Sequence, residues 1–470
     1  MPKEDIASTE VTELKATAAS TIQIGIYQIT VKSLFGYLDY TMPKDPDARV
    51  DPKVFILYGE NGCGKTTILE LAFHLLSPAT NRGHRSAIER VPFRTFQIIL
   101  TNGTVVRASR TPDNLTGRYS LIVEHQGDLI VDCVFDAEAQ PQFSPPESRK
   151  HFLEALEGLG HTIYLLSADR SINVDLWSRG EMLTRVRRPQ RSYRSPDEAT
   201  PEGVTEKTPK SGQDVALEFA LRQAHDWIRR HAVRSNNLGT GSANTIYAEI
   251  IKRITKFGRD GPREEAELFE DLTGTLDNLS AKAKDLAQFR LTPPLNVDDI
   301  RAALEQKQPD SAGAIGAVLE AFIDTTAARF KALESIYRLT STFVENLNWF
   351  YSGSGKRMAY DVVDGFAITS PIGKTLYPAW LSSGEKHLLM LFCHVLTARD
   401  KPSIFIIDEP ELSLNVKWQR QLIDSLLDIV TGTGVQFVLA THSLELLSQH
   451  FDSVIELTPT ILSSDQQRGT

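Results

Sequence analysis

Short apolar runs alternate with helical periodicities in the two outer parts of the chain. The apolar runs, at 54–57, 162–166, 403–407 and 435–440, end in polar residues. Runs of this length are typical of strands that are buried on both faces of a parallel sheet. Apolar residues recur at helical spacings in the segments 66–76, 384–398 and 416–430. Alternating strands and helices predict a parallel sheet with helices on both faces.

Three further regions favour β-structure. They cover 22–42, 93–135 and 357–370, and Asn-Gly and Gly-Asp dipeptides interrupt the second of them. Such dipeptides mark tight turns, so we expect hairpins there.

The middle of the chain has a different character. Residues 185–214 are rich in Pro, Ser, Thr and charge, which favours a linker. From 213 to 350 the pattern is helical, and its longest stretch, 312–350, has apolar residues mostly at helical spacings. That stretch is either a packed core helix or a coiled-coil-like arm that offers a partner surface.

A glycine-rich stretch, YGENGCGKTT, follows the first apolar run. Gly59 to Thr66 matches G-x-x-x-x-G-K-[ST], in which loop N–H groups and a helix N-terminus face phosphate oxygens. Gly62 and Gly64 lack the side chain that would block the approach of the backbone to a phosphate. Lys65 would reach the β- and γ-phosphates, and the Thr66 hydroxyl would bind Mg²⁺. The motif predicts a nucleotide-phosphate site.

Carboxylates end one of the later strands. SIFIIDEP places Asp408 and Glu409 at the C-terminal end of an apolar run, where open α/β sheets bind their ligands. Asp408 would help to hold Mg²⁺, and Glu409 would orient a water for attack on the γ-phosphate. Acids at strand ends also occur simply as turn residues.

Two more motifs belong to the same part of the chain. In LSSGEK, Ser382 and Glu385 have the spacing of a capping box for the following helix, and a helix N-terminus is also an anion site. ATHS brings His442 to the end of the strand 435–440. A lone histidine there is either structural or, beside a γ-phosphate, a hydrogen-bonding sensor.

The order of these motifs resembles that of the ATP-binding cassette (ABC) ATPases, in which two subunits sandwich two ATP molecules head to tail. The resemblance implies that Glu409 is the catalytic carboxylate, that His442 senses the γ-phosphate, and that residues 411–415 form the D-loop at the dimer interface. It implies Mg²⁺ ligands at Thr66 and Asp408. It implies ATP contacts at Gly59, Asn61, Gly62, Gly64, Lys65, Thr66 and Thr67, with Ser382, Gly384 and Glu385 contacting ATP in trans.

Departures from the transporter pattern indicate a branch of that family. The signature motif ends in Glu385, as in RecF-like and SMC-like ATPases, and the first strands resemble those of the OLD (overcoming lysogenization defect) group. No clear glutamine follows the strand at 162–166, so Ser167, Asp169 or Arg170 would replace the Q-loop.

The fold class that follows is α/β: an ABC-ATPase P-loop fold, with a mixed sheet and helices on both faces, interrupted by a mostly α-helical insertion. We expect an N-terminal ATPase lobe at 1–175 and a linker with the helical insertion at 176–355. The C-terminal ATPase lobe, with the signature, Asp408–Glu409 and histidine motifs, would cover 356–470.

Composition limits the partners. The 470-residue chain has a net charge of −9, so a DNA contact would have to be a local basic patch. Its three cysteines show neither a disulfide framework nor a metal-ligand spacing. No stretch has the pattern of a signal peptide or the length of a membrane span. We therefore expect a cytoplasmic protein with no membrane partner.

One basic stretch qualifies as such a patch. It could bind DNA phosphates or an acidic partner, or it could be a solvated linker. Its residues are Arg179, Arg185, Arg187, Arg188, Arg191 and Arg194, with Tyr193 among them.

The family resemblance leads to two main functional hypotheses. OLD proteins carry a TOPRIM nuclease domain, which we do not expect in the short segment after His442. The architecture resembles the stand-alone ATPases of bacterial anti-phage systems, such as PtuA of Septu and AriA of PARIS. The first hypothesis is therefore a slow, regulatory ATPase that forms a dimer or larger homo-oligomer and controls a separately encoded nuclease or toxin. The alternative is a RecF-like DNA-repair ATPase that binds DNA directly; the insertion and the glutamate signature count against a transporter motor.

Overall fold

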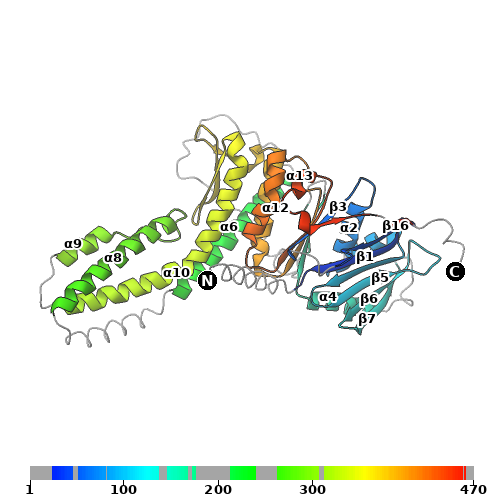
Figure 1. Cartoon of the computed structure of the whole chain (residues 1–470), viewed down its shortest axis with the longest axis horizontal. Helices are drawn as coiled ribbons and strands as arrows, with labels where there is room; N and C mark the ends of the chain where they lie inside the picture. The colour runs from blue at the N-terminus through cyan, green and yellow to red at the C-terminus, as the bar shows by residue number, and fades with distance from the viewer. Residues whose placement is uncertain are drawn as a thin grey trace, which may run out of the picture. The chain divides into compact units, whose positions relative to one another are not determined.

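In the computed structural model, drawn in Figure 1, the chain forms two compact units. The first unit comprises Met1–Pro209 and Ala398–Thr470, and the second comprises Lys210–Thr397. The structure describes residues 24–45, 51–80, 82–136, 146–167, 172–175, 212–239, 262–305, 312–458 and 460–461.

A six-stranded sheet organises the first unit, with the strand order β15-β3-β14-β13-β8-β9. Its strands are β3 (Val54–Tyr58), β8 (Thr162–Leu166), β9 (Ile172–Asp175), β13 (Ser403–Asp408), β14 (Val435–Thr441) and β15 (Val454–Glu456). All neighbours are parallel except β8 and β9. Every residue of β8, β13 and β14 is buried, as the continuous apolar runs predict.

A seven-stranded antiparallel sheet forms the second layer of this unit, in the order β16-β2-β1-β4-β5-β6-β7. Its strands are β1 (Ile26–Leu34), β2 (Leu38–Met42), β4 (Thr95–Leu100), β5 (Thr104–Ser109), β6 (Tyr119–His125), β7 (Asp128–Phe135) and β16 (Thr460–Ile461). The turn between β6 and β7 places Gln126 and Gly127 at φ 52° and 92°, as a two-residue type I′ hairpin requires. The hairpin expected there from the sequence is therefore confirmed.

The helices of the first unit are α2 (Lys65–Leu76), α3 (His84–Arg90), α4 (Pro146–Gly158), α12 (Val416–Ile429) and α13 (Leu444–Leu447). Helix α2 contacts β8, β13 and β14 of one sheet and β5 of the other. Its apolar face contributes Ile68, Leu69 and Phe73 to the core that both sheets share. The helix that follows the glycine-rich loop is thus fixed by packing on both sides.

The second unit is mostly helical. Its elements are α6 (Gly212–Gly239), α8 (Pro262–Ala287), α9 (Val297–Glu305), α10 (Ala312–Tyr351), α11 (Ser383–Thr397), β10 (Arg357–Asp361), β11 (Gly365–Thr369) and β12 (Thr375–Leu376). The stretch at 312–350 lies within α10, a single 40-residue helix. Helix α10 packs along α6 and α8 and buries Leu333, Phe343 and Leu347 completely. The architecture is the predicted α/β P-loop fold with a mostly helical insertion.

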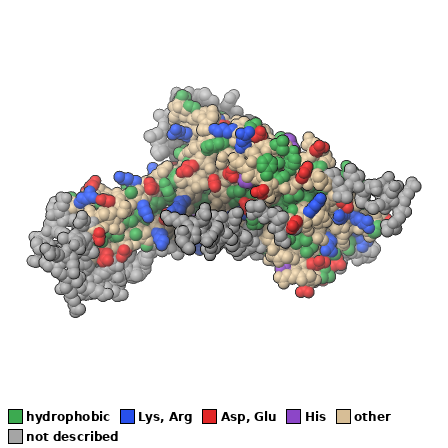
Figure 2. Space-filling model, in the orientation of Figure 1, with side chains coloured by type: hydrophobic (Ala, Val, Ile, Leu, Met, Phe, Trp, Pro, Cys, Tyr) green, Lys and Arg blue, Asp and Glu red, His purple; other side chains and the backbone are tan. Residues whose placement is uncertain are grey.

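The surface carries charges of both signs. On the face drawn in Figure 2, Lys and Arg side chains are interspersed with Asp and Glu, which suits the net charge of −9. Within the described ranges, none of the helices has the length and apolarity that crossing a bilayer requires.

Candidate functional site

The glycine-rich loop connects β3 to α2 and has the backbone of a phosphate-binding loop. Gly62 and Gly64 have φ of 84° and 86°, a left-handed conformation that favours glycine. Gly64 is the N-cap of α2, and a Cβ built on it would lie 2.9 Å from Leu34 Cδ2. The loop therefore requires glycine there for both conformation and space, and it leaves the first N–H groups of α2 available to an anion.

The lysine of the motif lies against its own loop. Lys65 is 6% exposed, and its Nζ donates to the carbonyl oxygens of Gly59 at 2.7 Å and Glu60 at 2.9 Å. The ammonium group is thus held inside the turn where a phosphate would bind. Asn61 is exposed and Thr67 is half-buried in the same loop and first helical turn.

A direct hydrogen bond joins the loop to the end of β13. Thr66 Oγ1 donates to Asp408 Oδ2 at 2.7 Å. Asp408 is 4% exposed, and its other oxygen, Oδ1, is buried with no hydrogen-bond partner among the described residues. Burial raises the pKa of Asp408, the Thr66 hydrogen bond lowers it, and the net effect is a raised pKa.

This arrangement fits Mg²⁺. The ion prefers oxygen ligands and combines one or two protein oxygens with phosphate oxygens. A hydroxyl and a carboxylate in contact, with one carboxylate oxygen unused, supply such a pair of ligands. A buried charge without a partner is costly, and a bound cation would remove that cost.

Glu409 and His442 meet at the ends of neighbouring strands. Glu409 has φ 48°, and its N–H donates to the Ala440 carbonyl at 2.8 Å, so the chain turns sharply after β13. His442 Nδ1 lies 3.5 Å from Glu409 Oε1. The His442 side chain is 47% exposed and that of Glu409 is 25% exposed, so both remain accessible to a ligand.

A third acid, Glu411, completes the cluster. The sequence analysis placed it only within the predicted D-loop. It is 5% exposed, and its Oε1 accepts hydrogen bonds from Thr441 Oγ1 at 2.5 Å and from the His442 N–H at 3.1 Å. His442 Nδ1 lies 3.4 Å from the same oxygen. The only sequence signal was a third acid shortly after Asp408–Glu409, and that spacing alone does not show what the acid contacts.

The signature motif begins helix α11 in the second unit. Glu385 Oε2 accepts from the Ser382 N–H at 2.7 Å, and the Glu385 N–H donates to Ser382 Oγ at 3.3 Å, which is the expected capping box. Gly384 is buried in the same turn. The trans contacts of these three residues with ATP stay a prediction.

The Glu385 carboxylate has further partners that the sequence did not indicate. Lys356 Nζ donates to both of its oxygens, at 2.9 and 2.7 Å, and Ser354 Oγ donates to Oε1 at 3.0 Å. Burial alone would raise the pKa of Glu385, but the bonds from Lys356 and Ser382 outweigh it and hold the pKa below its ordinary value. The 3% exposed side chain therefore connects the segment after α10 to the signature turn.

Some predicted residues lie outside the described part of the chain. They are Asp169, Arg170 and the basic stretch Arg179, Arg185, Arg187, Arg188, Arg191 and Arg194. Ser167, the remaining Q-loop candidate, is half-buried directly after β8.

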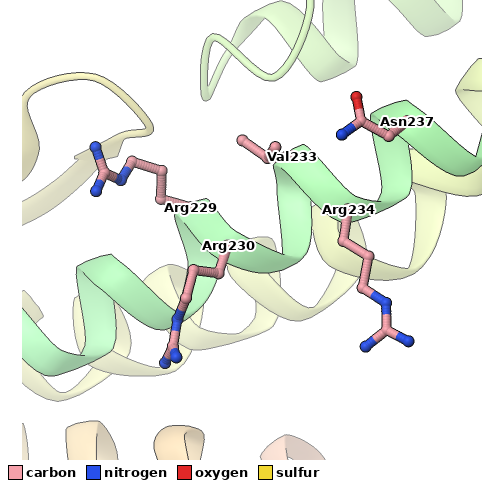
Figure 3. Close-up of a pocket in the computed structure, with 5 residues that line it drawn as sticks. All are labelled: Arg229, Arg230, Val233, Arg234 and Asn237. Carbon is pink, nitrogen blue, oxygen red and sulfur yellow. The ribbon is translucent and has the colours of Figure 1, made fainter.

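A different basic surface is visible on helix α6. In the view of Figure 3, the side chains of Arg229, Val233 and Asn237 extend upward from the helix and those of Arg230 and Arg234 extend downward. These five residues line an open hollow of about 540 Å³. The three arginines are exposed, and the sequence analysis missed them because a helical pattern with scattered charges is the ordinary signal of a solvated face.

Comparison with protein families gives one extended match. The family described as "AAA domain, putative AbiEii toxin, Type IV TA system" matches residues 164–448, more than half of the chain.

Curated relatives match over shorter stretches. The LolD ATP-binding protein of a lipoprotein-releasing system in Ruegeria pomeroyi is 36% identical over 88 residues, which are 19% of this chain and 37% of LolD. The Retron Ec83 probable ATPase of Escherichia coli is 24% identical over 217 residues, covering 38% of this chain and 40% of the relative. The chain thus spans less than half the length of these relatives.

Among solved structures, the Smc head domain of Pyrococcus furiosus, bound to the C-terminal domain of ScpA, covers 94% of this chain and 98% of its own. The identity is 14% and the TM-score is 0.38.

Proposed function

Because the chain belongs to the AAA-domain family described as a putative AbiEii toxin of a type IV toxin–antitoxin system, we propose that it binds and hydrolyses ATP. The observation that carries the proposal is the 2.7 Å hydrogen bond from Thr66 to Asp408. It joins a glycine-rich anion loop to a buried carboxylate whose second oxygen has no partner among the described residues. A nucleotide phosphate with Mg²⁺ matches this combination of groups.

Each residue of the cluster has a part in the proposed reaction. Lys65 leaves its carbonyl partners to contact the β- and γ-phosphates, while the loop N–H groups hold the phosphate oxygens. Thr66 and Asp408 would hold Mg²⁺, which neutralises the charge of the phosphates. Glu409 orients the attacking water and accepts its proton, and His442 contacts the γ-phosphate from the neighbouring strand.

The proposal includes a dimer. In the ABC arrangement, Ser382, Gly384 and Glu385 of one subunit face the ATP of the other, and the 411–415 segment crosses the interface. The exposed side chain of Ser382 and the N–H groups at the start of α11 suit a phosphate contact. We expect slow turnover, because the proposed role of ATP is to close the dimer as a switch.

The biological role that we propose is control of a separately encoded effector in bacterial defence against phage. The description of the family as part of a toxin–antitoxin system supports a partner protein. The similarity to a retron ATPase also supports the proposed role in defence. In this scheme the ATP-bound homo-oligomer, with an architecture like that of PtuA or AriA, holds a nuclease or toxin and releases it on a signal.

A trapped state tests this proposal. Glu409→Gln protein, purified with ATP and Mg²⁺ from the native host, should retain ATP, hydrolyse it at least about 100-fold more slowly than wild type, and migrate as a dimer or larger assembly. Lys65→Ala protein, the matched control, should retain no nucleotide. A stoichiometric second protein in the trapped assembly would support effector control. Normal turnover of Glu409→Gln would show that the catalytic carboxylate lies elsewhere.

The arginines of α6 favour direct DNA binding as a second candidate function. Arg229, Arg230 and Arg234 present three exposed guanidinium groups around the hollow in Figure 3, and such groups bind phosphates with a strong salt dependence. Changing all three to Gln should weaken DNA binding. The slope of log K against log[salt] should become less steep, by an amount that corresponds to up to about three phosphate contacts. Unchanged DNA binding, or none in wild type, would remove this candidate.

A further inference from the structure

Glu411 occupies an unusual position for an acid. It follows the sharp turn at Glu409 and is 5% exposed. Its Oε1 receives the Thr441 hydroxyl at 2.5 Å and the His442 N–H at 3.1 Å. Its Oε2 is buried with no hydrogen-bond partner in the described part of the chain. One side chain therefore joins the segment after β13 to the end of β14.

The same oxygen also faces the imidazole. His442 Nδ1 lies 3.4 Å from Glu411 Oε1 and 3.5 Å from Glu409 Oε1. Two carboxylates thus converge on one ring nitrogen, and Nε2 is the nitrogen left for a ligand. Glu411 Oε1 thus accepts a hydrogen bond from the backbone of His442 and also faces its ring.

We propose that Glu411 is a positioning residue that holds His442 in place for the proposed ATPase reaction. It fixes the Thr441–His442 turn and keeps a proton on Nδ1, so that Nε2 points toward the bound phosphate. This inference rests on the proposed function for its catalytic consequence, but the orientation of the ring is a property of the nucleotide-free protein. In this proposal Glu411 acts through His442 and is assigned no contact of its own with ATP or Mg²⁺.

The chemistry explains why an acid is needed. An ionised carboxylate can only accept hydrogen bonds, so it accepts those of Thr441 Oγ–H and His442 N–H and favours a proton on the Nδ1 atom that faces it. The proton on one imidazole nitrogen is set by the hydrogen bond that this nitrogen makes. A glutamine at 411 can keep the first two bonds through its carbonyl oxygen. In the flipped orientation its NH₂ group takes the place of Oε1 and donates to Nδ1, which would move the ring proton to Nε2.

A double-mutant cycle tests whether Glu411 acts through His442. Glu411→Gln, His442→Ala and the double variant are compared with wild type for ATP turnover. Glu411→Gln should lower kcat about 10-fold, within the range seen for residues that orient a functional histidine, with little change in KM. In the His442→Ala background the same change should have no more than about a twofold effect, because coupled residues are not additive. Effects that multiply in the double variant would overturn the proposal.

A spectroscopic measurement tests the same inference without turnover. In nucleotide-free protein labelled with ¹⁵N-histidine, the His442 signals, assigned by their loss in His442→Ala, should show Nδ1 protonated in wild type. Glu411→Gln should shift that proton at least partly to Nε2. The control is Glu445→Gln, since Glu445 is an acid of the same segment that pairs with Arg420 at the surface, and it should leave the His442 signals unchanged.

The two measurements separate the possible failures. If wild type hydrolyses no ATP but the nitrogen signals change as expected, the proposed function fails and the positioning role stands. If Glu411→Gln leaves the His442 signals as in wild type, the positioning role fails whatever the turnover. Thr441→Val, which removes one of the two donors, gives a second variant should Glu411→Gln fold poorly.

Discussion

Each of the two units buries a carboxylate at a predicted nucleotide motif, and the two carboxylates are satisfied very differently. Asp408, in the first unit, receives one hydrogen bond from Thr66, and its second oxygen has no partner among the described residues. Glu385, in the second unit, receives Lys356 on both oxygens and the Ser382 N–H on one. One carboxylate is left with capacity for a further cation, whereas the other is paired inside its own unit.

The pKa directions express the same difference. Burial disfavours an ionised carboxylate, and this effect dominates at Asp408, whose pKa is raised. At Glu385 the hydrogen bonds outweigh burial, and the pKa is lowered. An unsatisfied buried charge is a common mark of a binding site, and a fully paired one is a common mark of a structural joint. The comparison can be tested by changing one group in each unit.

Asp408→Asn should have the largest effect: it should lower ATP turnover and raise thermal stability. ATP turnover should fall by a factor on the order of 10² or more, because a ligand of the proposed Mg²⁺ site is lost. The nucleotide-free variant should nevertheless melt at a higher temperature than wild type at pH 7, since a buried charge has been removed.

The pH dependence of that gain follows from the raised pKa of Asp408. Protonation of Asp408 removes the buried charge from wild type. The stability gained by Asp408→Asn should therefore shrink as pH falls from 7 toward 3.8, the ordinary pKa of an aspartate. Melting curves at several pH values check this, with the exposed Asp113→Asn as control. A variant less stable than wild type at pH 7 would contradict the view that the buried charge of Asp408 is uncompensated.

Lys356→Met should destabilise the protein by about 3 kcal/mol, because it leaves Glu385 buried without its cation. The stability that the paired Glu385 contributes is present above its ordinary pKa of 4.5 and is lost as pH falls through its lower folded value. The difference from wild type should therefore narrow on acidification. Urea unfolding across this range measures it. Lys374→Met, at an exposed lysine of the same unit, should change stability by less than about 0.5 kcal/mol.

Ser382→Ala, at the second motif, should lower stability less than Lys356→Met does, by about 1 kcal/mol, as for the loss of a helix cap. Its effect on turnover sharpens the comparison. If Ser382 also contacts the ATP of a second subunit, kcat should fall by far more than the loss of stability explains. Turnover equal to wild type would limit Ser382 to capping α11.

The sequence determined the local parts of this protein because local patterns are enough to specify them. The glycines of the loop, the apolar strands at 54–57 and 403–407 and the capping spacing of Ser382 and Glu385 each depend on residues close together in the chain. They predicted the P-loop fold, its helical insertion and the capping box, all of which the structure contains. The meeting of Thr66 with Asp408 followed from the rule that parallel strands end at one edge of the sheet.

Only the tertiary structure decided which side chains complete these motifs. Lys356 reaches Glu385 through the turn that follows a 40-residue helix, and Glu411 reaches His442 across two neighbouring strands. The arginines of α6 show as an exposed group only once the packing of α10 defines the opposite face of that helix. Pairings between distant residues depend on register, burial and side-chain direction together, and one sequence without its fold specifies none of these at such separations.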